Sequence, residues 1–101
     1  MAFVKIGSLS QFPRDSVQEA IIGGNSYAIC NLAGELHALG GACPHAGGPL
    51  GQGALMNQAL MCPWHGYEFD PKTGENLDDP LMRVEKFPLK VEGDEILIDV
   101  P

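Results

Sequence analysis

Short apolar runs alternate with turn-forming residues along the whole chain. The runs are four to nine residues long, and glycine, proline, asparagine and aspartate gather between them. None keeps the 3.6-residue period of an amphipathic helix, and the spacing is typical of a β sandwich or barrel. The runs predicted to be strands are residues 3–6, 17–22, 27–31, 36–39, 59–62, 67–70, 83–91 and 95–100.

The residues between these runs suit tight turns. Residues 23–25, 31–34 and 92–94 contain glycine, asparagine or aspartate, which tolerate positive φ in hairpins. Pro88 lies inside the run 83–91 and has no N–H to donate, so this strand should lie at a sheet edge or be bulged there. A helical turn over residues 14–19 is a weak alternative. We therefore expect an all-β, antiparallel sandwich or barrel.

Two segments interrupt the strand pattern, namely residues 40–53 (GGACPHAGGPLGQG) and 61–66 (MCPWHG). The first contains Cys43 and His45, and the second contains Cys62 and His65, with sixteen residues between His45 and Cys62. Thiolate and imidazole ligands suit zinc or an iron–sulfur centre rather than calcium or magnesium.

The types of ligand in each loop distinguish a zinc site from an iron–sulfur centre. Structural zinc sites commonly take two like ligands from one loop, whereas each loop here offers one cysteine and one histidine. Mixed pairs fit two loops that each send a cysteine to one iron and a histidine to another, as in Rieske centres. A zinc-stapled interaction module stays open as a remote alternative.

The motif CPH-x₁₆-CPWH resembles the signature of the Rieske family, and the chain is similar in length to soluble Rieske ferredoxins. The resemblance implies a single Rieske domain over residues 1–101. Its cluster-binding loops, at about 40–53 and 61–66 and extending to about 81, would form a small subdomain at one tip. It implies one [2Fe–2S] cluster, with Cys43 and Cys62 on the inner iron and His45 and His65 on the outer iron.

The function that the resemblance implies is electron transfer rather than catalysis. The protein would carry single electrons from a flavin-containing reductase to a terminal Rieske oxygenase of a ring-hydroxylating dioxygenase system. The alternative is a small Rieske subunit of an assimilatory nitrite reductase or another multi-subunit redox enzyme. No nucleophile–base grouping and no G-x-G-x-x-G nucleotide turn is present, so we expect no direct reaction with NAD(P)H.

The positions around the ligands predict a low reduction potential. As the resemblance implies, respiratory Rieske proteins have a disulfide between the loops and Ser and Tyr hydroxyls near the cluster. This chain has Gly48 and Trp64 at the disulfide positions, and Tyr67 and Phe69 at the hydroxyl positions. We expect a potential near the bottom of the Rieske range of about −150 to +300 mV.

Charge and composition limit the partners. A net charge of −7 disfavours nucleic acid and anionic membranes and suits a basic protein face. No apolar run approaches a membrane span of about 20 residues, and three cysteines fit a disulfide framework poorly. We expect a cytoplasmic monomer.

Six further features carry expectations. Cys30 should be a buried small apolar residue, His37 a surface strand residue, and Trp64 a shield over the cluster. Three glycines, Gly47, Gly48 and Gly66, should let the backbone approach the sulfurs. An apolar collar is expected from Pro49, Leu50, Pro80 and Leu81, and an acidic steering surface from Glu68, Asp70, Glu75, Asp78 and Asp79.

Overall fold

The computed structural model describes residues 2–44, 47–64 and 66–101, and within them the regular elements are strands and two short 3-10 helices. The strands are β1 (Ala2–Ser8), β2 (Ser16–Ile22), β3 (Asn25–Leu32), β4 (Glu35–Gly40), β5 (Ala54–Met56), β6 (Ala59–Met61), β7 (Glu68–Phe69), β8 (Lys86–Phe87), β9 (Leu89–Glu92) and β10 (Glu95–Val100). The 3-10 helices are η1 (Leu9–Gln11) and η2 (Leu50–Gln52). No helix within these ranges is long and apolar enough to cross a lipid bilayer.

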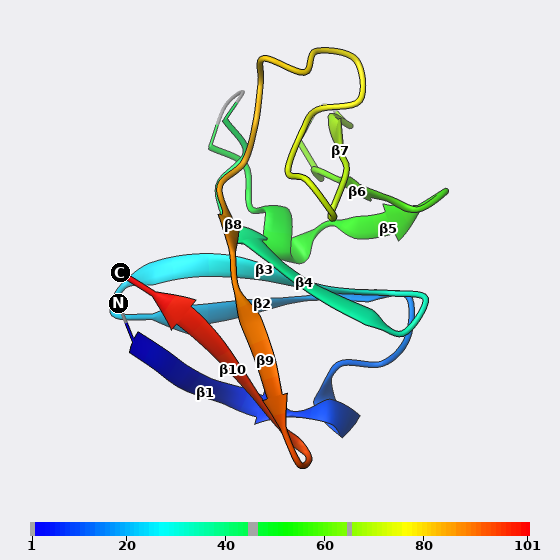
Figure 1. The fold of residues 1–101 in the computed structure, drawn as a ribbon. Helices are drawn as coiled ribbons and strands as arrows, with labels where there is room; N and C mark the ends of the chain where they lie inside the picture. Colours follow the sequence, from blue (N-terminus) through cyan, green and yellow to red (C-terminus); the bar gives the residue numbers. More distant parts are fainter. Residues whose placement is uncertain (1, 45–46, 65) are drawn as a thin grey trace.

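The strands form three antiparallel sheets. One has the order β1-β10-β9, the second β2-β3-β4-β8, and the third β5-β6-β7. The first two make the sandwich in the lower part of Figure 1, and the third, small sheet lies above it with the loops that were singled out in the sequence. The predicted all-β antiparallel class is therefore confirmed.

Strand β3 is the middle layer of the molecule, because both of its faces are covered. Tyr27 and Ile29 belong to the core between the two large sheets, together with Ile96 and Ile98 of β10. The alternate residues Ala28 and Cys30 belong to a second core, beneath the small sheet. A strand buried on both faces reads as a continuous apolar run, which explains why residues 27–30 show no polar alternation.

Pro88 marks the point where the chain passes from one sheet to the other. The predicted strand 83–91 is two strands, β8 at the edge of the four-stranded sheet and β9 at the edge of the three-stranded sheet. The carbonyl of Pro88 accepts a hydrogen bond from the Asp99 N–H at 2.9 Å. Because Pro88 lies at a sheet edge, its missing N–H removes no hydrogen bond between strands. The expectation of an edge position is confirmed.

Two local expectations about secondary structure need correction. Strand β5 was missed because it follows directly on the glycine-rich segment 40–53. The alternative of a helical turn over residues 14–19 is wrong. Asp15 has a positive φ of 59° and its N–H donates to the carbonyl of Asn31, and β2 then pairs with β3 along its whole length.

Candidate metal centre

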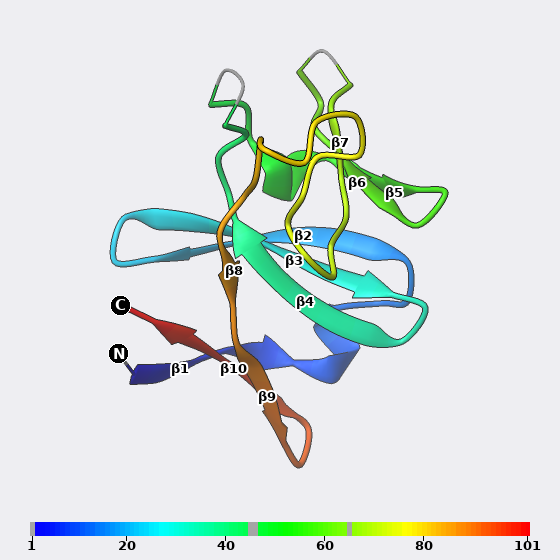
Figure 2. The ribbon, with the colours of Figure 1, turned by 45° about the horizontal axis from the view of Figure 1, so that its top comes forward.

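Two loops at the small-sheet end of the molecule carry the predicted cysteines. The first follows β4 and contains Cys43; the second joins β6 to β7 and begins with Cys62. Figure 2 shows both loops rising beside each other from this end. The predicted ligands His45 and His65 lie outside the described residues.

Backbone hydrogen bonds close both loops at their cysteines. The Cys43 N–H donates to the Gly48 carbonyl at 2.8 Å, and the Gly47 N–H donates to the Cys43 carbonyl at 2.7 Å. In the second loop the Cys62 N–H donates to the Tyr67 carbonyl at 2.7 Å. Each cysteine is thus fixed at the base of a short turn, which restricts where its sulfur can lie.

The two sulfurs face each other in a buried setting. Cys43 and Cys62 are 2% and 1% exposed, lie in one apolar core and form no disulfide. Burial raises the pKa of Cys62. The Trp64 backbone N–H bonded to the thiol lowers that pKa, while the hydrogen bond and charge of Cys43 raise it.

This arrangement fits an iron ligand pair. Burial and the neighbouring Cys43 both raise the pKa of the Cys62 thiol, because its charged form would lack a counter-charge there. A bound metal cation removes this penalty and deprotonates coordinating thiols. The two thiols therefore suit an iron ion, and their assignment to the inner iron stays a prediction.

Of the three glycines proposed near the sulfurs, Gly48 alone lies against one. A Cβ atom on Gly48 would lie 2.8 Å from the Cys62 Sγ, so this position has no space for a side chain. Gly47 and Gly66 instead have positive φ angles of 75° and 70° and serve as turn residues. A Cβ atom on Gly47 would meet no described atom within 4 Å.

The expected apolar collar separates into two groups. Leu50 is completely buried beneath the cysteines, whereas Leu81 is 92% exposed on the loop after β7. Trp64 is 48% exposed, so it covers its surroundings with only part of its ring. Leu50 thus packs in one apolar core with the two cysteines, while Trp64 and Leu81 are left exposed.

The two remaining sequence candidates have opposite outcomes. Cys30 is fully buried as expected, and burial raises the pKa of its thiol to about 12, so it stays a protonated apolar residue. The surface assignment of His37 is wrong, because this residue is 8% exposed and pairs with Cys30 across β3 and β4. The sequence feature that indicates burial of His37 is the two-residue alternation of β4, which puts this side chain on the same face as the buried Leu39.

His37 is held by a single carboxylate. Its Nε2 lies 2.7 Å from the Glu35 Oε1. Burial lowers the pKa of His37 and is the main effect, while the hydrogen bond with Glu35 opposes it; Lys86 and Lys72 lower the pKa further. We conclude that His37 is a structural residue of the sheet interface rather than a metal ligand.

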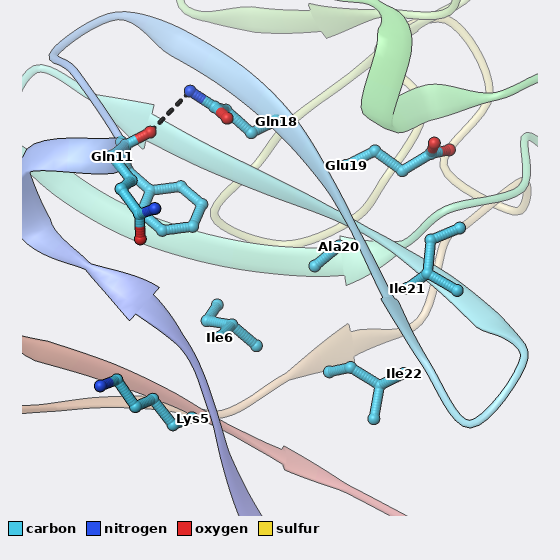
Figure 3. A pocket seen from close by; sticks show the side chains of 9 residues that line it. Lys5, Ile6, Gln11, Gln18, Glu19, Ala20, Ile21 and Ile22 are labelled. Atoms are coloured by element: carbon cyan, nitrogen blue, oxygen red, sulfur yellow. Dashed lines mark hydrogen bonds between the residues drawn. The ribbon is translucent and has the colours of Figure 1, made fainter.

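A groove of about 270 Å³ opens between β1 and β2, which are edge strands of the two large sheets. Figure 3 shows Ile6, Ala20 and Ile22 around it, with Gln18 donating a hydrogen bond to the Gln11 carbonyl. Its lining contains no thiol or imidazole, so it is separate from the candidate metal centre.

Comparison with known proteins identifies the domain. The Rieske [2Fe-2S] domain family matches residues 2–88. The chain is 39% identical over 83 residues to apoptosis-inducing factor 3 of Mus musculus, covering 81% of this chain but 14% of that relative's length. It is 29% identical over 94 residues to the ferredoxin component of the naphthalene 1,2-dioxygenase system of Pseudomonas aeruginosa, covering 92% of this chain and 90% of the relative.

Solved structures share the fold over nearly the whole chain. The ferredoxin of carbazole 1,9a-dioxygenase from Nocardioides aromaticivorans has a TM-score of 0.86 at 24% identity, with 97% of both chains covered. A putative NADH-dependent nitrite reductase small subunit from Mycobacterium tuberculosis has a TM-score of 0.87 at 20% identity, covering 96% of this chain and 93% of the subunit. The chain belongs to the Rieske [2Fe-2S] domain family, and its cofactor is one Rieske-type [2Fe–2S] cluster.

Proposed function

We propose that the protein is a low-potential Rieske ferredoxin. It carries single electrons from a flavin-containing reductase to the Rieske centre of a terminal oxygenase in a ring-hydroxylating dioxygenase system. The observation that carries this proposal is the pair of facing, buried cysteines at one end of a small Rieske domain. The ferredoxin component from Pseudomonas aeruginosa, similar over 90% of its own length, supports the same role.

The proposed ligands are Cys43 and Cys62 for the inner iron and His45 and His65 for the outer iron. When bound, the cluster supplies a site that stores and releases one electron. The protein's residues hold the sulfurs in place, exclude water from beneath them through Leu50 and Leu60, and carry out no substrate chemistry of their own.

Exposed apolar side chains around the two loops suit docking by redox partners. Trp64 is 48% exposed, Leu77 54% and Leu81 92%. The exposed carboxylates of Asp78 and Asp79 lie between these two leucines in the chain, and the net charge is −7. Complementary charge speeds encounter, and small apolar contacts permit quick release, so a basic partner face and a short-lived complex fit this surface. We further propose that the carrier works as a cytoplasmic monomer.

A reconstituted electron-transfer chain tests this function. Purified protein is added to a flavin reductase, a terminal Rieske oxygenase and NAD(P)H, and turnover of the oxygenase is followed. We expect turnover to depend on the protein and to saturate with its concentration, as for a diffusing carrier. Stable co-purification with a large reductase, without transfer to any oxygenase, would instead favour a small subunit of a nitrite reductase or related enzyme.

A further inference from the structure

Trp64 and Gly48 join the two cluster loops by direct contact. Besides meeting the Cys62 sulfur, a Cβ atom on Gly48 would lie 3.0 Å from Cγ and 3.1 Å from Cδ2 of Trp64. The indole ring therefore lies against the bare Cα of Gly48. Gly48 is buried, whereas Trp64 is 48% exposed.

Each partner in this contact is itself tied to a cysteine. The carbonyl of Gly48 accepts the hydrogen bond from the Cys43 N–H at 2.8 Å. The backbone N–H of Trp64 bonds to the thiol of Cys62. The ring on Gly48 therefore links the turn that holds one sulfur to the turn that holds the other.

The two segments also approach each other closely at the base of the loops. The contact of Trp64 with Gly48 lies further along the loops. Gly53 lies against the carbonyl of Met61, with no space for a side chain. The two segments are thus in contact on both sides of Cys62, through the Trp64 ring on one side and through the Met61 carbonyl on the other. Cys43 and Cys62 are both free thiols, so within the described residues the contact between the loops is non-covalent.

We propose that Trp64, seated on Gly48, is a positioning residue: a clasp that holds the two loops together and keeps the cluster in the protein. The indole offers a broad rigid surface with little side-chain entropy to lose, and glycine lets the ring approach the backbone closely. The proposal needs the family's cluster but not the redox partners, so it can be tested whether or not the proposed carrier role holds.

Replacing the ring tests the clasp directly. Loss of the cluster to an iron chelator is timed in the holoprotein by the decay of its visible absorbance. We expect Trp64→Ala to lose the cluster about tenfold faster than the wild type, equivalent to about 1.4 kcal/mol. Trp64→Phe, which keeps a ring on Gly48, should restore most of the lifetime. Met56→Ala is the matched control, because Met56 is 49% exposed in the same small sheet and should leave the lifetime unchanged.

A substitution at Gly48 tests the same contact independently, through the fluorescence emission of Trp64. Trp64 is the only tryptophan of the chain, so the emission of the holoprotein excited at wavelengths that tyrosine does not absorb reports its surroundings alone. Gly48→Ala should push the ring into water, shift its emission to longer wavelength and shorten the lifetime of the cluster. Gly40→Ala is the control, since a Cβ atom there meets its nearest neighbour at an ordinary 3.4 Å.

Three results would overturn the clasp. The first is a cluster lifetime in Trp64→Ala equal to that of Met56→Ala. Another is a Trp64→Phe variant as short-lived as Trp64→Ala, because the ring contact would then not be the cause. The third is faster loss in Gly48→Ala with unchanged tryptophan emission, because the effect would then act through the Cys62 sulfur. If Trp64→Ala yields no holoprotein, the Trp64→Phe and Gly48→Ala results decide the question.

Discussion

At the scale of single residues, the candidate site rests on two buried cysteines whose sulfurs are neighbours. Cys43 and Cys62 are buried side by side over the completely buried Leu50 and Leu60. Cys30, one layer below, has the same burial but no sulfur partner, and the pKa of its thiol is about 12. Burial alone therefore does not single out the predicted ligands, whereas the neighbouring sulfurs of Cys43 and Cys62 do.

Exchanging a cysteine tests this distinction. We expect Cys62→Ser to abolish or severely reduce cluster binding, because a hard, weakly acidic hydroxyl replaces a thiolate in a buried position. Iron and acid-labile sulfide per chain measure the result. Cys30→Ala is the matched control and should keep two irons and two sulfides. Full cluster content in Cys62→Ser would refute the ligand assignment.

Phe69 is the second residue with a testable consequence. It is completely buried in the core next to the cysteines and has no hydroxyl to donate. A hydrogen bond to a charged group contributes about 1.5–3 kcal/mol, which is about 65–130 mV for one electron. We expect a negative midpoint potential in the wild type, and a rise of about this size in Phe69→Tyr.

Protein-film voltammetry at neutral pH measures both potentials. Phe87→Tyr is the control, because Phe87 packs edge-on against Tyr27 in the other core and its hydroxyl should leave the potential unchanged. A positive midpoint in the wild type would contradict the low-potential assignment.

At the scale of elements, the position of the small sheet depends on the outer face of β3 and β4. His37 lies on that face, buried and bonded to Glu35, with Lys86 and Lys72 near enough to affect its charge. Since burial lowers the pKa of His37 below its ordinary 6.5, the unfolded chain binds its proton more readily than the folded one. His37 therefore favours folding above pH 6.5 and disfavours it as the pH falls below that value.

Chemical unfolding of the holoprotein between pH 5 and 8 measures this effect. We expect His37→Gln, which can still donate a hydrogen bond to Glu35, to lose less stability than the wild type as the pH is lowered. Glu35→Gln is a second probe. It removes the carboxylate that favours the charged imidazole, so it should steepen the loss at low pH. Identical pH profiles for the wild type and His37→Gln would contradict the role of His37.

The elements also show what the sequence alone could predict. Alternation and turn residues predict most of the strands. The absent N–H of Pro88 predicts an edge position, and the structure shows that the chain changes sheets there. Strand β5 was missed because it follows directly on the glycine-rich segment 40–53, which predicts turns. The burial of His37 was missed although its place two residues before Leu39 puts both side chains on one face of β4.

At the scale of the whole molecule, a sandwich supports a small sheet that presents two loops side by side (Figures 1 and 2). The spacing of cysteine and histidine in the sequence predicts the ligand set, because two loops with mixed ligands suit two irons, and the structure brings Cys43 and Cys62 together. The contact of Trp64 with Gly48 could not be predicted, since it depends on how closely the loops approach. The fold thus supplies the geometry for a chemistry that the sequence had already indicated.

The central claim is a two-iron cluster with two cysteine and two histidine ligands, and the Mössbauer spectrum of the ⁵⁷Fe-enriched protein tests it most directly. We predict two unequal iron sites in equal amounts, one bound by the thiolates of Cys43 and Cys62 and one by the imidazoles of His45 and His65. Two equivalent all-sulfur iron sites, or a protein that binds one zinc and no iron, would contradict the account.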